Sequence, residues 1–134
     1  MYVLFDIGGT KTRVAITDDL FTIAAVEKFD TPLSYREGLA AVVDAVRKLT
    51  NGTPITSIAG GIRGPLNHEK TGIVSEKVLH DWVGRALTKD LEKELRAPVY
   101  LENDTAIVGL GEVHYGAGKG HDIVAYHTVS TGVG

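Results

Sequence analysis

The hydrophobic periodicity of the chain changes once, near residue 34, and this change limits the folds that are open to it. Before residue 34, three apolar segments at Tyr2–Ile7, Thr12–Thr17 and Leu20–Phe29 are separated by short turns and predict a three-stranded antiparallel meander. After that point, Ser34–Glu37 predicts a capping box, which precedes one apolar helical face formed by Leu39, Val42, Val43, Val46 and Leu49.

The second half of the chain alternates between the two kinds of element. Its apolar segments predict, in order, a strand at Ile55–Ala59, a helix capped by Asp81 and ending before Pro98, a strand at Val99–Leu101, a helix at Asn103–Tyr115 and a strand at Ile123–Val129. A meander followed by strand–helix alternation predicts an α/β domain with a mixed sheet and helices on its faces.

The composition excludes several functional classes. The net charge is −3 and the lysines and arginines are scattered, which argues against a nucleic-acid-binding surface. No apolar segment approaches the ~20 residues that span a bilayer, so we expect no membrane insertion. The chain has no cysteine, and we therefore expect no disulfide and no zinc site within it. These features are compatible with a cytoplasmic protein.

A glycine pair lies between the first two predicted strands, in the segment Asp6-Ile7-Gly8-Gly9-Thr10-Lys11. Glycines at such a turn allow backbone N–H groups to approach an anion, and Thr10 and Lys11 add a hydroxyl group and a cation. Asp6 could hold a hydrated Mg²⁺ ion. The alternative is an ordinary hairpin turn with an acidic flank, and the spacing alone favours neither interpretation.

A second polar segment, Glu102-Asn103-Asp104-Thr105, lies where a predicted strand meets a predicted helix. One interpretation is that Asn103 or Asp104 is simply the N-cap of that helix. The other is that Asp104, kept ionised by the helix N-terminus, accepts a proton from an attacking hydroxyl group. Both interpretations can hold, with Asn103 capping the helix and Asp104 reaching a ligand.

Together these motifs resemble the ROK family (repressors, open reading frames and sugar kinases). The resemblance covers essentially the whole chain. Asp6–Lys11 is similar to the family's first phosphate motif, and Gly61–Leu66 to a sugar-lobe turn in which Arg63 replaces the usual proline. Glu102–Gly120 looks like the catalytic segment, and Ser130–Gly134 resembles the start of the second phosphate motif.

The resemblance implies a ribonuclease H-like (actin-like ATPase) lobe and transfer of the ATP γ-phosphate, with Mg²⁺, to a hydroxyl group of a hexose or N-acetylhexosamine. It implies that Asp104 is the general base. The other implied roles are sugar binding by Glu102, Asn103 and Gly64, contact with Mg²⁺ by Asp6, and nucleotide or phosphate binding by Gly8, Gly9, Thr10, Lys11, Thr131, Gly132 and Gly134.

The sequence also departs from the family pattern. Val78-Leu79-His80-Asp81-Trp82 replaces the usual N-L-P-G-W, so that one asparagine contact with the sugar is missing; His80 is either a substitute or an exposed loop residue. The family's zinc cluster and most of the ATP pocket have no counterpart in these residues. We expect residues 1–120 to form the N-terminal lobe and residues 121–134 to be the first strand and phosphate turn of a truncated second lobe.

Two further expectations and two alternatives follow. The isolated chain should be nearly inactive, and the strand predicted at Ile123–Val129 should favour a homodimer.

One alternative is a non-catalytic ROK-type sugar sensor, although the chain begins at its first strand without a DNA-binding module. The other is a lobe of a different actin-like phosphotransferase or ATPase, which would share the Asp6 loop without needing Glu102–Asp104.

Overall fold

The computed structural model describes residues 1–129, and its first three strands form the meander that the sequence predicts. The sheet order is β3-β2-β1-β4-β5, with β1, β2 and β3 antiparallel and β1, β4 and β5 parallel. The elements are β1 (Tyr2–Ile7), β2 (Lys11–Thr17), β3 (Ala25–Asp30), α1 (Tyr35–Thr50), β4 (Ser57–Ile62), the short 3₁₀ helix η1 (His80–Trp82), α2 (Leu87–Leu95), β5 (Val99–Asn103) and α3 (Asp104–Tyr115).

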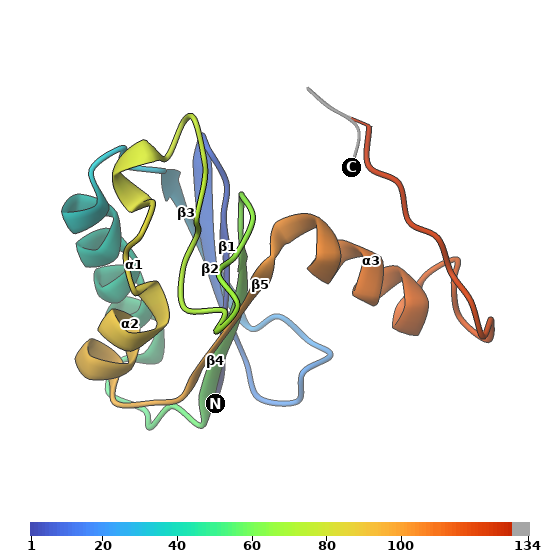
Figure 1. Ribbon diagram of the computed structural model, residues 1–134. Coiled ribbons are helices and arrows are strands. Elements are labelled where there is room, and N and C mark those ends of the chain that lie inside the picture. The colour runs from blue at the N-terminus through green and yellow to red at the C-terminus, as the bar shows by residue number, and fades with distance from the viewer. Residues whose placement is uncertain (130–134) are drawn as a thin grey trace.

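Helices α1 and α2 cover one face of the sheet, which we call the covered face, whereas α3 extends away from the sheet on the other side, the open face (Figure 1). The alternating burial of β1 explains this arrangement, because Val3, Phe5 and Ile7 are buried while the residues between them are half-buried. Apolar residues of α1 and α2, including Val42, Val46 and Leu91, complete the core.

Trp82 occupies the junction between α1 and η1 and is 2% exposed. Its ring lies edge-on to Tyr35, at 5.3 Å between centroids, and its Nε1 donates to the Pro32 carbonyl oxygen at 3.1 Å. A Cβ on Gly38 would lie 2.0 Å from the indole ring. Glycine at this position therefore allows the helix to approach the indole closely.

The third strand is shorter than predicted. β3 begins at Ala25, and the prediction of a strand over residues 20–24 was wrong. The cause is a local turn in which Asp19 Oδ1 accepts hydrogen bonds from the backbone N–H groups of Phe21 and Thr22, at 2.9 and 2.7 Å. Leu20 within this turn has a φ of 64°, which is incompatible with a strand.

Two predicted caps at helix N-termini were wrong: Ser34 is at the N-cap position of α1 without capping it, and Asp81 does not cap α2. The Ser34 side chain makes no capping hydrogen bond, and the backbone N–H of Tyr35 donates instead to Asp81 Oδ2 at 2.8 Å. Asp81, predicted to cap the second helix, thus supports the start of the first one. α2 begins only at Leu87, after η1 and a short turn.

The last predicted strand is absent from the described residues, because residues 123–128 run in irregular conformation beyond α3 (Figure 1). Ile123 is 92% exposed, and no neighbouring strand is available in residues 1–129 to pair with this segment. The strand prediction was therefore wrong here. Within the same residues, no helix combines the length and the apolar character that crossing a bilayer requires.

Candidate functional site

The three parallel strands end side by side at one edge of the sheet, which we call the carboxyl edge. Ile7 at the end of β1 pairs with Ile62 at the end of β4, and Ile62 pairs with Asn103 at the end of β5. The segments that follow these strands are the Gly8–Gly9 turn, the loop beginning at Arg63, and the start of α3. The carboxyl ends of parallel strands commonly form ligand sites in α/β proteins.

Asp6 and Asp104 line one cavity of about 460 Å³ on the open face. Asp104 is the first residue of α3, and Asp6 is the penultimate residue of β1. Gly61 makes this arrangement possible, since a Cβ there would lie 3.0 Å from the Asp104 Cα. The fold thus brings together two carboxylates that are 98 positions apart in the sequence.

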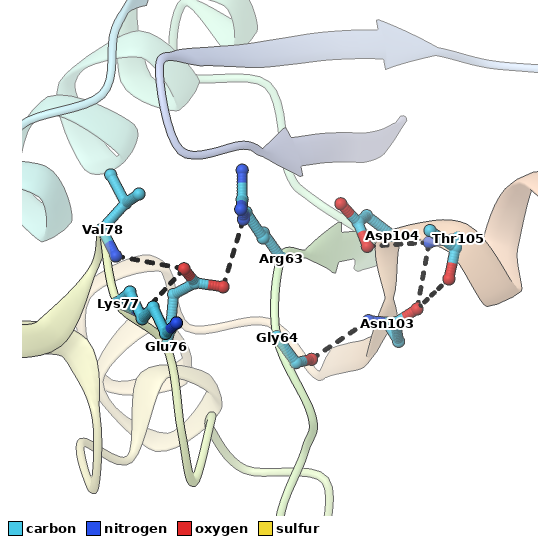
Figure 2. Close-up of polar contacts among 8 residues, drawn as sticks. All are labelled: Arg63, Gly64, Glu76, Lys77, Val78, Asn103, Asp104 and Thr105. Atoms are coloured by element: carbon cyan, nitrogen blue, oxygen red, sulfur yellow. Dashed lines mark hydrogen bonds and ion pairs between the residues drawn. The ribbon is translucent and has the colours of Figure 1, made fainter. Parts of the chain in front are cut away.

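Asn103 is the N-cap of α3, as one of the two sequence interpretations predicted. Its Oδ1 accepts hydrogen bonds from the backbone N–H groups of Thr105 and Ala106, at 3.1 and 3.3 Å. Its Nδ2 donates to the Gly64 carbonyl oxygen at 3.0 Å, which ties the loop after β4 to the start of α3 (Figure 2). Asn103 therefore positions Asp104, whether or not it also binds a sugar.

Gly64 has a φ of 109°, a conformation that residues with a side chain rarely adopt. A Cβ there would also lie 3.0 Å from the Ser75 carbonyl oxygen. The glycine requirement at this position is therefore set by the backbone of the loop. The predicted sugar contact by Gly64 stays a prediction.

Glu102 lies elsewhere. Its carboxylate pairs with Lys70 and accepts a hydrogen bond from the Asn103 backbone N–H at 3.0 Å. The bonds from Lys70 and from this N–H lower the pKa of Glu102 below its ordinary value. Glu102 lines a separate cavity of about 820 Å³ that also includes Lys70 and His68, so the structure does not bring it into the cavity of Asp104.

The Gly8–Gly9 turn is tight, with the Gly8 N–H donating to the Lys11 carbonyl oxygen at 3.0 Å. The Lys11 ammonium group pairs with Asp30 of β3. Thr10 is exposed, and its carbonyl oxygen accepts a hydrogen bond from the Thr31 N–H at 2.9 Å. The turn is therefore at the predicted place, but its predicted cation is paired with the neighbouring strand.

Arg63 is the residue that sequence reasoning missed. A Cβ on Gly9 would lie 3.3 Å from Arg63 Nη1 and 3.5 Å from Val78 Cγ1. The available signal was a single charged residue within the glycine cluster at residues 60–64. His80, weighed as a substitute ligand, is an exposed residue of η1.

The carboxylate pair is compatible with a hydrated Mg²⁺ ion, which takes one or two carboxylates and completes its coordination with water and phosphate oxygens. Asp6 also accepts a hydrogen bond from Arg13 Nη1 at 2.8 Å, so that Arg13 would have to share this carboxylate with the ion. Among residues 1–129 no group of three or more His, Asp or Glu residues could hold a metal by protein ligands alone. Thr131, Gly132 and Gly134 lie outside the described residues.

The similarities to known proteins agree with this geometry. The sequence profile of the ROK family matches residues 2–134. The chain is 31% identical to the glucokinase of Streptomyces coelicolor, over 96% of this chain and 40% of that protein. It is also 31% identical to the N-acetyl-D-glucosamine kinase of Mannheimia succiniciproducens, over 97% of this chain and 43% of that protein. The chain thus spans about 40% of the length of these relatives.

The fold agrees as well. The crystal structure of a ROK family glucokinase from Streptomyces griseus, in complex with glucose and AMPPNP, superposes with a TM-score of 0.86 at 29% identity, covering 99% of this chain and 42% of that one. This similarity confirms the predicted actin-like α/β lobe. Because the family profile matches nearly every residue, we conclude that the chain belongs to the ROK family.

Proposed function

We propose that this chain is the N-terminal part of an ATP-dependent kinase that transfers the γ-phosphate of ATP to a hydroxyl group of a hexose or N-acetylhexosamine. The observation that carries the proposal is the cavity at the carboxyl edge, in which Asp104 of α3 and Asp6 of β1 lie together. The sugar class is suggested by the relatives, which are glucokinases and N-acetyl-D-glucosamine kinases.

Asp104 is the proposed general base. Its carboxylate stands at the N-terminus of α3, where the helix dipole favours a negative charge. It would accept the proton of the sugar hydroxyl as that oxygen attacks the γ-phosphorus atom. Asn103 fixes the backbone from which Asp104 projects, through its cap of α3 and its bond to Gly64.

Asp6 is the proposed contact for Mg²⁺. When bound, the ion would neutralise negative charge on the phosphate groups of ATP. The turn at Gly8–Gly9 begins two residues after Asp6, so the proposed phosphate contacts lie next to it along the chain. Phosphoryl transfer depends mainly on positioning and charge neutralisation, and these residues would supply both.

The activity belongs to proteins more than twice the length of this chain. We therefore expect the 134 residues by themselves to bind a hexose with little or no turnover. We place the reaction in the cytoplasm, where ATP is available.

We also expect a homodimer, because Ile123, Tyr126 and Val129 expose apolar side chains. Light scattering that shows only monomer at high concentration would reject the homodimer.

A chimera tests the proposal. Residues 1–134 replace the matching segment of the Streptomyces coelicolor glucokinase, and ADP formation is followed with glucose and with N-acetylglucosamine. We expect sugar-dependent turnover that falls by at least ~10²-fold in Asp104→Asn, as is typical for loss of general-base catalysis.

Asp44→Asn makes the same chemical change at an exposed residue of α1, is the matched control and should keep most of the turnover. The proposal fails if the chimera folds and binds glucose yet produces no sugar phosphate, or if Asp104→Asn retains full activity. ADP release that does not depend on sugar would indicate an ATPase instead.

A further inference from the structure

Arg63 lies against the glycine turn at the carboxyl edge. Its Nη1 and Cδ atoms would lie 3.3 and 3.5 Å from a Cβ on Gly9, so the guanidinium group packs closely against the bare backbone of this glycine. Lys11, which follows the turn in the sequence, is paired with Asp30 of β3. The position of a positive charge at this turn is thus set by the loop after β4.

Both ends of Arg63 are held in place. Its backbone N–H donates to the Ile7 carbonyl oxygen at 3.0 Å, and its Nε donates to Glu76 Oε2 at 3.1 Å. The Glu76 side chain is only 9% exposed, and its Oε1 accepts the backbone N–H groups of Lys77 and Val78 at 2.8 and 3.1 Å (Figure 2). A carboxylate that is itself held by two backbone N–H groups therefore fixes the direction of the guanidinium group.

The ion pair with Glu76 uses one of the five N–H donors of the guanidinium group. Within residues 1–129, the terminal nitrogens of Arg63 donate to no other residue, and its side chain is 43% exposed. The backbone N–H groups of Gly9 and Thr10 likewise donate to no backbone acceptor in this part of the chain. Several donors at the carboxyl edge are thus open to a ligand.

These donors favour an anion. A guanidinium group binds phosphate oxygens through paired, charge-assisted hydrogen bonds, which are roughly twice as strong as neutral ones. A neutral sugar hydroxyl gains much less from a fixed positive charge. Asp6, two residues before Gly8 in the chain, lines the cavity of Asp104, where the phosphoryl group would be transferred.

We propose that Arg63 is a phosphoryl-binding residue of this site and that Glu76 is the residue that positions it. The identity of the ligand rests on the kinase function proposed above. The terminal nitrogens of Arg63 bind the oxygens of the phosphoryl group in front of the Gly8–Gly9 turn. They supply there a positive charge whose direction the pair with Glu76 fixes, whereas the Lys11–Asp30 pair is solvent-exposed.

Nuclear magnetic resonance on the 134-residue chain tests this, with inorganic phosphate as the probe. The signals followed are the Arg63 Nε–Hε group and the Gly9 backbone N–H. We expect both to shift with phosphate, with an apparent Kd that rises with added NaCl. Arg63→Gln should weaken binding, read at Gly9, at least tenfold, and Arg63→Lys should restore part of it.

Glu76→Gln should weaken phosphate binding less than Arg63→Gln and should move the Arg63 Nε–Hε signal before any phosphate is added. Lys77→Gln removes one positive charge from the same loop and is the matched control, with an expected Kd within twofold of the wild type. Glucose 6-phosphate and AMPPNP, tested in place of phosphate, distinguish a phosphoryl group carried by the sugar from one carried by the nucleotide. A response of Arg63 to either supports the proposal.

The inference is overturned if Arg63→Gln, with an otherwise native spectrum, binds phosphate as the wild type does, or if Lys11→Gln weakens binding more. It is separable from the proposed function. Phosphate binding at Arg63 in a chain whose chimera transfers no phosphate would reject only the kinase. A chimera that remains active while Arg63 ignores phosphate would reject only the role of Arg63.

Discussion

Two neighbouring rows of side chains across the sheet have opposite environments. On the covered face, Ile16, Val3, Ile58 and Val99 pair in register, and none is more than 8% exposed. The adjacent row, whose side chains point to the open face, consists of Val26, Ala15, Leu4, Ala59 and Tyr100. Tyr100 in this row is 64% exposed.

The difference separates the packed core on one side of the sheet from the cavity of the proposed site on the other. Helices α1 and α2 and residue Trp82 seal the covered face. The cavity that contains both Asp6 and Asp104 is on the open face, where α3 meets the carboxyl edge. Substitutions on the covered face should therefore affect folding, whereas those at the carboxyl edge should affect ligands.

The largest effect should come from Trp82→Ala. Removing this buried indole leaves a cavity between α1 and η1 and should lower the free energy of unfolding by about 3–5 kcal/mol. Tyr100→Ala, an aromatic side chain on the open face, should cost less than about 1 kcal/mol. Urea unfolding followed by circular dichroism measures both, and equal losses would contradict the contrast between the faces.

An intermediate effect is expected for Asn103→Ala. The substitution removes the cap of α3 and the bond to Gly64, which should lower the local stability of α3 by about 0.5–2 kcal/mol. Because α3 lies outside the main core, the loss should appear chiefly as faster amide hydrogen exchange in α3, with strands β1 and β4 unchanged. Uniformly faster exchange would show that α3 is part of the cooperative core.

The smallest effect is a pH dependence. Burial alone would raise the pKa of Glu76, but hydrogen bonds from the Val78 and Lys77 N–H groups and the pair with Arg63 lower it below its ordinary value. A carboxylate with a lowered pKa stabilises the fold above its unfolded pKa, and this stabilisation is lost as pH falls through the folded value.

The stability difference between wild type and Glu76→Gln should therefore be largest above pH ~5 and shrink toward pH ~3. Urea midpoints at a series of pH values measure this difference. A difference that grows on acidification would contradict the assigned direction of the pKa change. An unchanged difference would show that Glu76 contributes no titrating interaction to the fold.

The meander, the mixed sheet and the junction at Asn103–Asp104 could be predicted because local signals mark them, whereas β4 spans Ser57–Ile62 and not the predicted Ile55–Ala59. The apolar run before Asp6-Ile7-Gly8 and the one before Glu102-Asn103-Asp104 mark the ends of strands, and both can be recognised before the fold is known. The sequence also gave both interpretations of Asn103, and its capping role is confirmed.

Several other features escaped prediction because the decisive partner lies far away in the chain. Asp81 caps a helix 46 residues earlier, and Lys11 pairs with Asp30 rather than with the turn beside it. The Glu102 carboxylate pairs with Lys70 and does not line the cavity of Asp104. Hydrophobic periodicity does not reveal such pairings. The contact between Arg63 and Gly9 also joins residues far apart in the chain and could not be predicted in this way.

Strand β5 ends at Asn103 and α3 starts at Asp104, with no connecting residue between them. A rotation of the backbone at this junction would swing the far end of α3, ~18 Å away at ~1.5 Å per residue, while hardly displacing its first residue. The proposed proton acceptor is thus the residue that would move least in such a rotation. The residues at the far end of α3 could be displaced by a large distance while that carboxylate keeps its position relative to the sheet.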